Sequence, residues 1–291
     1  VTFVYPERTF SENENRVLAT MPQFSWEKLF NGKFMSEYET YITDQFFLRD
    51  SWIKLKVFSE MALNKQDING VYLGKDGYLV ERHEDSKIDV EMLQKSMDRL
   101  VQFTEKYANQ LGSEHVKVML VPTASEILTE KLPAFASGFD QNGMIDKIYE
   151  QLPEGTALDV RETLKEHADE SIYYKTDHHW TTLGAFYAYQ EWAKVMGFPI
   201  PSLEEVKQTV VVEDFLGTVH SKLNVELSND EMHIFELPNT PSKVKVTVDM
   251  TESFDTMYID EYLEVKDKYS YYLDGNHGLT EIISNSEGEG T

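Results

Sequence analysis

The stretch YYKTDHHWTTLGAFYAYQEWAKVMG, residues 173–197, carries most of the information in this sequence. Its apolar spacing predicts a helix over residues 181–196, which Gly197 ends. The Asp-His-His of residues 177–179 therefore falls in a polar loop directly before a helix. Open α/β sheets place their working residues in loops of this kind, at strand–helix junctions. This loop is therefore the candidate site, and the fold is inferred outward from it.

Strand and helix patterns alternate upstream of this loop. The apolar run VKVMLV, residues 116–121, predicts a strand, and residues 156–160 predict a second one. Amphipathic patterns over residues 93–111 and 144–152 predict the helices beside them. The alternation favours an α/β fold with a parallel sheet flanked by helices.

The two ends of the chain differ from this central part. Residues 1–87 are expected to form an N-terminal segment packed on the core, helical over residues 31–64 and then a β-hairpin with an Asp-Gly turn. Residues 88–291 are expected to form the α/β domain. Short strand patterns separated by Asn, Asp and Pro predict a β-rich insertion near residues 202–265.

Composition excludes several classes of function. The 291 residues include 51 acidic and 27 basic ones, for a net charge of −24, which argues against binding to nucleic acid or to anionic lipid. The chain has no cysteine, so disulfides, thiolate metal sites and cysteine nucleophiles are all excluded. No apolar run approaches the length of a membrane span.

The Asp-His-His sequence has three possible interpretations. An aspartate two positions from a histidine can orient the imidazole and stabilise its charged form, which makes the histidine a general base for a serine hydroxyl. Alternatively, the three residues are polar loop residues that cap the following helix. They could also ligate Zn or Mn, but adjacent histidines on an extended chain point apart. We therefore expect no metal and no cofactor.

The motif DHHW, residues 177–180, followed by TTLGA, resembles the DHHW proteins of Gram-positive bacteria. These are related to the alginate O-acetyltransferase proteins, which carry an SGNH-hydrolase-like domain. The resemblance covers nearly the whole chain. Similar segments are FSENENR (10–16), GKFMSEYETYITDQFFLRD (32–50), GVYLGKDGYL (70–79), VKVMLVPTASEILTEKLP (116–133), DQNGMIDKIYEQL (140–152), EDFLGTVHSK (213–222) and KDKYSYYLDGNHGLTEI (266–282).

The resemblance implies a Ser-His-Asp triad on an SGNH-like α/β sheet. Asp177 takes the place of the orienting carboxylate and His179 that of the general base. A carboxylate oxygen of Asp177 should then lie within hydrogen-bond reach of a ring nitrogen of His179, roughly 2.6–3.2 Å. His178 has no role in the triad and should point away from that pair. Trp180 is expected to pack the loop or to line the pocket.

The nucleophile is the point at which the sequence departs from the family pattern. The family's serine lies in an Asp-Ser-Tyr/Phe segment beyond a Gly-Asn-His region. Here Gly-Asn-His is present at residues 275–277, but no Gly-Asp-Ser or Lys-Asp-Ser occurs among the 291 residues. The sequence is therefore expected to end before the nucleophile strand, which would leave this chain inactive.

Two further residues are pocket candidates. Asn276 could supply an oxyanion donor, or it could simply belong to a turn. Ser125 follows the strand predicted over residues 116–121 and could be catalytic, although a helix N-cap is the competing interpretation.

The expected function is an extracytoplasmic O-acyl (acetyl) transferase or esterase that acts on a cell-surface polysaccharide. Its expected partners are that polysaccharide and a membrane acyl-donor protein, with no nucleic acid. The first residue is Val1 rather than Met, for which a removed signal or anchor segment is one explanation and an engineered start is another. The expected location is extracytoplasmic, secreted or anchored at the cell surface through a removed N-terminal segment. The alternative from another class is a non-catalytic carbohydrate-binding or cell-wall-associated module.

Overall fold

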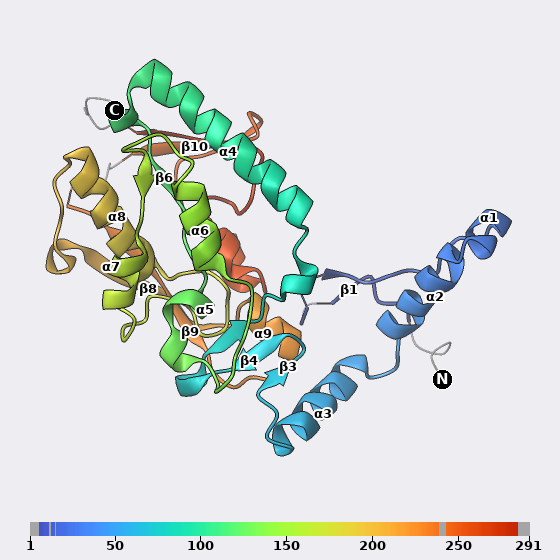
Figure 1. Cartoon of the computed structure of the whole chain (residues 1–291). Helices are drawn as coiled ribbons and strands as arrows, with labels where there is room; N and C mark the ends of the chain where they lie inside the picture. Colours follow the sequence, from blue (N-terminus) through green and yellow to red (C-terminus); the bar gives the residue numbers. More distant parts are fainter. Residues whose placement is uncertain (1–5, 12, 15, 239–242, 285–291) are drawn as a thin grey trace.

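The computed structural model describes residues 6–11, 13–14, 16–238 and 243–284. It is a mixed α/β structure in which helices surround several small sheets (Figure 1). The predicted mixture of helices and strands is thus confirmed, whereas the strand pairings of the described residues are antiparallel except for one short parallel pair. Among the helices of these residues, none combines the length and the apolar character that crossing a bilayer requires.

The N-terminal part is a short antiparallel pair followed by three helices. Figure 1 shows α1 and α2 extending away from the rest of the protein. The helical pattern over residues 31–64 is confirmed, but as two helices, since the chain turns at Leu48 with φ of 52°. The elements are β1 (Phe10–Ser11), β2 (Arg16–Val17), α1 (Trp26–Phe30), α2 (Lys33–Asp44) and α3 (Arg49–Ala62).

The predicted hairpin is confirmed and lies against the candidate loop. Its antiparallel sheet has the order β3-β4-β5, and positive φ values at Asp76 and Gly77 turn the chain between β4 and β5. The Leu79 amide donates a hydrogen bond to the Lys175 carbonyl at 2.8 Å, which attaches the hairpin to the loop. The strands are β3 (Asp67–Ile68), β4 (Val71–Leu73) and β5 (Leu79–Glu81).

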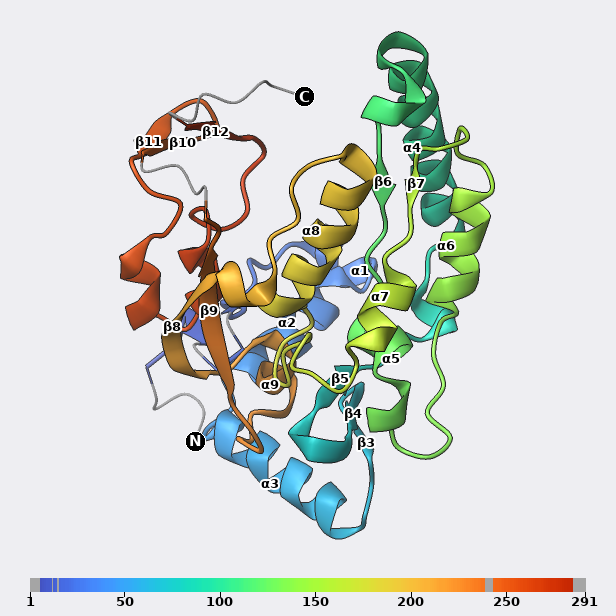
Figure 2. The same ribbon diagram turned by 90° about the vertical axis from the view of Figure 1, so that its left-hand side faces the viewer.

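The parallel part of the fold is a two-stranded pair between helices. Figure 2 shows β6 and β7 with α8 on one side and α4 and α6 on the other. The pairing is short because the Leu120 amide binds the Tyr149 hydroxyl at 3.0 Å instead of a neighbouring strand. Within the described ranges this is the one parallel pairing. The elements are α4 (Val90–Leu111), β6 (Val118–Met119), α6 (Gln141–Tyr149), β7 (Ala157–Leu158) and α8 (Thr182–Met196).

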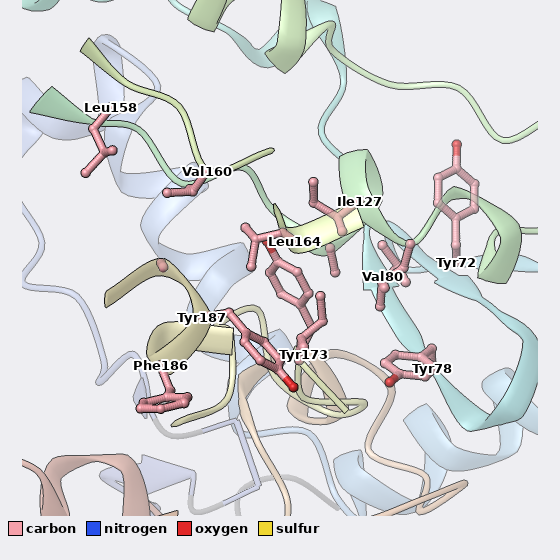
Figure 3. Close-up of a cluster of buried hydrophobic side chains, with 14 of the residues drawn as sticks. Tyr72, Tyr78, Val80, Ile127, Leu158, Val160, Leu164, Tyr173, Phe186 and Tyr187 are labelled. Carbon is pink, nitrogen blue, oxygen red and sulfur yellow. The ribbon is translucent and has the colours of Figure 1, made fainter. Parts of the chain in front are cut away.

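The largest buried cluster joins the hairpin to the helices around the parallel pair (Figure 3). Tyr78, directly before β5, and Val80 of β5 belong to one cluster with Leu164 of α7 (Arg161–Glu166) and Phe186 of α8. Tyr173 is 2% exposed, and its hydroxyl donates to the Pro122 carbonyl at 2.7 Å. The candidate loop therefore starts from a residue fixed in the core.

The division of the chain at residue 87 stays a prediction.

The C-terminal part is rich in β-structure, as its pattern predicts. Strands β8 and β9 form an antiparallel ribbon beside α8, and a second antiparallel sheet has the order β11-β10-β12. The segment 249–279, between β10 and β12, returns to the candidate loop and is called the returning segment below. The elements are β8 (Lys207–Phe215), α9 (Thr218–Leu223), β9 (Asp230–Glu236), β10 (Val244–Val248), β11 (Glu252–Phe254) and β12 (Thr280–Ser284).

Candidate active site

The loop that contains the DHHW motif has paired ends, and a carboxylate from a distant strand fixes its conformation. Tyr173 and Trp180 form an isolated antiparallel bridge, so the residues between them bend outward. Asp230, at the start of β9, accepts hydrogen bonds from the amides of Lys175 (2.7 Å) and Thr176 (2.8 Å). Its carboxylate also accepts from the Thr176 hydroxyl at 2.6 Å. The loop conformation is therefore set by a carboxylate more than fifty residues away in the sequence.

Asp177 and His179 form a directly hydrogen-bonded pair. Oδ1 of Asp177 lies 2.5 Å from Nδ1 of His179 and also accepts from the His179 amide at 3.0 Å. The predicted contact is thus confirmed. With Nδ1 occupied, Nε2 of His179 is the nitrogen left to exchange a proton, and it has no hydrogen-bond partner within the described ranges.

Thr218, the first residue of α9, binds the other oxygen of Asp177. Oδ2 accepts from the Thr218 amide at 2.7 Å and from its hydroxyl at 2.9 Å. Burial alone would raise the pKa of Asp177, but the hydrogen bonds from His179 and Thr218 hold this pKa well below its usual range. The carboxylate is therefore ionised throughout the physiological pH range and can stabilise a charged imidazole.

The absence of a side chain at Gly217 allows the contact between Thr218 and Asp177. A Cβ atom at this position would lie 2.3 Å from Cβ of Asp177 and 2.8 Å from its Cα. The φ of Gly217 is −82°, so the requirement for glycine is one of space and not of backbone conformation. The roles of Gly217 and Thr218 are not apparent in the sequence, where the only signal is a Gly-Thr pair inside the family-like segment 213–222.

His178 does not point away from the pair, so that prediction is wrong. Its ring centroid lies 3.9 Å from that of His179, and its Nδ1 lies 2.8 Å from the Thr218 hydroxyl oxygen. Since this hydroxyl donates to Asp177, it accepts from Nδ1–H of His178. The reason is the bent backbone at residues 175–179, which removes the alternation expected of an extended chain. Burial lowers the pKa of His178.

These three side chains could also approach a single cation. Ligand atoms of Asp177, His178 and His179 all lie within 4.8 Å of one another. However, Nδ1 of His179 is bound to Asp177 and Nδ1 of His178 to Thr218. A metal ion bound to Oδ1 of Asp177 would have to displace the proton shared with His179. The expectation that no ion is shared here stays a prediction.

An aromatic ring covers one face of His179. The Tyr269 ring, from the returning segment, stacks on the imidazole with centroids 4.2 Å apart and an interplanar angle of 8°. Burial, with the nearby charge of Asp177, raises the pKa of Tyr269 to about 12, so its ring stays uncharged. The stacked ring covers this face of the imidazole and so restricts its orientation.

Asp177 and His179 line a hollow of about 470 Å³, called the histidine hollow below. The structure brings Asn276 to this hollow, as the sequence suggests, and Gly275 lies beside it. The serines that line it are Ser221 and Ser270, whose hydroxyls donate to the Gly217 carbonyl (3.3 Å) and to Asp267 (2.8 Å). The full lining is Asp177, His178, His179, Phe215, Gly217, Thr218, Ser221, Lys266, Asp267, Tyr269, Ser270, Tyr272, Leu273, Gly275 and Asn276.

The structure does not bring Ser125 to this hollow. It lies in α5 (Ala124–Ile127), where its hydroxyl is 2.9 Å from that of Thr123. The N-cap of α5 is Thr123, so the N-cap interpretation of Ser125 is also wrong by two residues. Trp180 packs partly on the core and lines a neighbouring hollow, in agreement with its expected place.

The mixed α/β chain thus places a buried Asp177, hydrogen-bonded to a half-buried His179, directly before α8. The chain belongs to the DHHW protein family, whose model matches residues 70–291. No curated protein sequence matches it.

Solved structures show the same fold. A DHHW family protein from Eubacterium siraeum is 22% identical with a TM-score of 0.57, over 75% of this chain and 72% of that one. Bacillus cereus PatB1 is 17% identical with a TM-score of 0.57, over 72% of this chain and 74% of that one. PatB1 with a sulfonyl adduct is 18% identical with a TM-score of 0.54, over 72% and 73% of the two chains.

Proposed function

We propose that this chain belongs to an extracytoplasmic O-acyl (acetyl) transferase or esterase that acts on a cell-surface polysaccharide. The observation that carries the proposal is the Asp177–His179 pair, with Nδ1 bound to a buried carboxylate and Nε2 available to the histidine hollow. This arrangement is that of a general base and its orienting group. The acyl substrate and the carbohydrate acceptor follow from the family resemblance.

The mechanism is acyl transfer through an acyl-serine. Nε2 of His179 takes the proton of a serine hydroxyl as the serine oxygen attacks the acyl carbonyl carbon. The imidazolium returns this proton to the leaving group, and the acyl group stays on the serine. An acceptor hydroxyl or a water molecule then loses its proton to Nε2 and attacks the acyl carbon. The acyl–serine bond breaks, and the imidazolium returns the proton to the serine oxygen. Asp177 remains ionised throughout, and the Asn276 amide donates to the oxyanion.

The serine is proposed to come from the Asp-Ser-Tyr/Phe segment that the family resemblance implies, which these 291 residues do not contain. The sulfonyl adduct of PatB1 supports this covalent chemistry, because a protein nucleophile forms such an adduct by displacing a leaving group from sulfur. The pair β6–β7 is proposed to belong to an SGNH-like parallel sheet. A membrane acyl-donor protein is the proposed partner.

The test is covalent labelling with a fluorophosphonate probe. A protein that includes the expected Asp-Ser-Tyr/Phe segment should be labelled, and its Ser→Ala variant should not be. His179→Ala should abolish most labelling, because the hydroxyl loses its proton acceptor, whereas His115→Ala, at a histidine outside the histidine hollow, should leave labelling unchanged.

The 291-residue chain by itself should not be labelled. Stoichiometric labelling of this chain would place the nucleophile within it. Ser270, which lines the histidine hollow, would then be the first residue to replace. Labelling of the longer protein that survives His179→Ala would contradict the proposed base.

A further inference from the structure

A second hollow of about 210 Å³ adjoins the histidine hollow and is called the aromatic hollow below. The two share Tyr269 and Tyr272 as lining residues. Its volume lies below the roughly 300–1,000 Å³ of pockets that enclose drug-sized ligands, so it suits one small ring. The full lining is Tyr174, Trp180, Thr181, Thr182, Ala185, Ile234, Phe235, Tyr258, Tyr269 and Tyr272.

The walls of the aromatic hollow are fixed before any ligand arrives. The Tyr258 ring stacks on Tyr271 with centroids 5.3 Å apart. The Tyr272 hydroxyl donates to the His233 carbonyl at 2.7 Å, and its ring meets Tyr269 edge to face. A ligand that enters therefore meets aromatic faces that are already in place, which reduces the entropy lost on binding.

Polar groups on these aromatic side chains are left without partners. Trp180 and Tyr258 line the hollow, and neither the indole N–H of Trp180 nor the hydroxyl of Tyr258 makes a hydrogen bond to any residue that the structure describes. Neither atom is sealed from solvent. Aromatic faces with donors at their edges match a pyranose ring, which has apolar C–H faces and a rim of hydroxyls.

The uncharged lining of the aromatic hollow favours neutral sugars over anionic ones. None of the lining residues of the aromatic hollow is charged, and the whole chain carries a net charge of −24. An anionic sugar would find no counter-charge there and would be repelled by the field of the protein.

We propose that the aromatic hollow binds an uncharged pyranose ring of the acceptor polysaccharide, next to the base at His179. Trp180 and Tyr258 supply the stacking surface and the hydrogen bonds to the ring hydroxyls. Tyr269 contacts the imidazole on one side and lines the sugar site as well. The assignment rests on the proposed function and gives it a substrate class, a neutral rather than an acidic polysaccharide.

The test uses NMR on the 291-residue chain and needs no turnover. N-acetylchitotetraose, a neutral oligosaccharide, should shift the indole N–H signal of Trp180, and the anionic tetragalacturonate should not. Trp180→Phe should weaken binding of the neutral sugar by roughly tenfold. Tyr258→Phe, which removes only a hydroxyl, should weaken it by a smaller factor. Trp52→Phe, an exposed tryptophan on α3, is the matched control and should change nothing.

Other outcomes separate this inference from the proposed function. A neutral sugar that shifts His179 but not Trp180 would overturn the inference and leave the catalytic pair intact. Stronger binding of tetragalacturonate, no binding of either sugar, or a Trp180 shift caused by p-nitrophenyl acetate alone would also overturn it. Failure of the proposed function gives a different result: the Nδ1–H signal of His179 would be identical in the native protein and in Asp177→Asn.

Discussion

Replacing Gly217 by alanine should break the contact between Thr218 and Asp177. The added methyl group would lie 2.3 Å from Cβ and 2.4 Å from Oδ2 of Asp177, where carbon atoms normally stay about 3.5–4.0 Å apart. The clash also reaches Cα of Asp177 at 2.8 Å, so rotation of the side chain cannot relieve it. The backbone must separate, and both hydrogen bonds from Thr218 to Oδ2 are then lost.

The magnitude follows from the charge on Asp177. A hydrogen bond to a charged group contributes about 1.5–3 kcal/mol, so the loss of two should lower the free energy of unfolding by about 3–6 kcal/mol. Urea denaturation at neutral pH measures this change. The Nδ1–H signal of His179, followed by NMR, should also shift, because a displaced carboxylate no longer accepts its hydrogen bond in the same geometry.

Gly155→Ala is the matched control. Gly155 has φ of +80° and open space around its would-be Cβ, so alanine there costs only backbone strain, about 1–2 kcal/mol. Gly217→Ala should cost more although its φ of −82° suits alanine. If Gly217→Ala is the milder of the two, or leaves the Nδ1–H signal of His179 unchanged, the proposed fixing of Asp177 by Thr218 is refuted.

Three further predictions concern the same region. Thr218→Val should lower the free energy of unfolding by about 1.5–3 kcal/mol by removing one donor to Asp177, and Thr218→Ser should restore most of it in urea denaturation; equal losses would show that the hydroxyl is unimportant. Burial lowers the pKa of His220 to about 4, so the folded protein binds fewer protons than the unfolded chain between pH 6.5 and 4. Stability should therefore fall as the pH falls through that window, by about 3 kcal/mol from this residue, and His220→Phe should remove that part of the pH dependence; an identical pH profile in the variant would contradict this. Adding Zn²⁺ should not raise the Tm, since Nδ1 of His178 and of His179 are bound to Thr218 and Asp177; a rise that EDTA reverses and His178→Ala abolishes would establish a metal site instead.

The sequence predicts well those features that depend on local pattern. The helix over residues 181–196 is present with Thr181 as its N-cap and Gly197 at its end, because capping and periodicity act over a few residues. The Asp177–His179 contact was also predictable, since the two residues are close in the sequence.

Features set by distant segments could not be predicted. The strand over residues 116–121 is reduced to Val118–Met119, because the Tyr149 hydroxyl takes a backbone partner that a ladder would have used. His178 turns toward the pair, where Nδ1–H donates a hydrogen bond to the hydroxyl of Thr218, forty residues away. Tyr269 reaches His179 only through the long path of the returning segment.

The returning segment has both of its ends held together, because β10 and β12 pair from Val244↔Ser284 to Val248↔Thr280. The strand pairing therefore closes the loop at its ends, and this pairing does not depend on the residues in between. Doubling the length of a flexible loop costs only about 0.6 kcal/mol of closure entropy. Insertions around Tyr258 could thus reshape the aromatic hollow while Asp177 and His179, which lie outside the loop, keep their geometry. Sequence variation in this loop can therefore change the aromatic hollow with little effect on the Asp177–His179 pair.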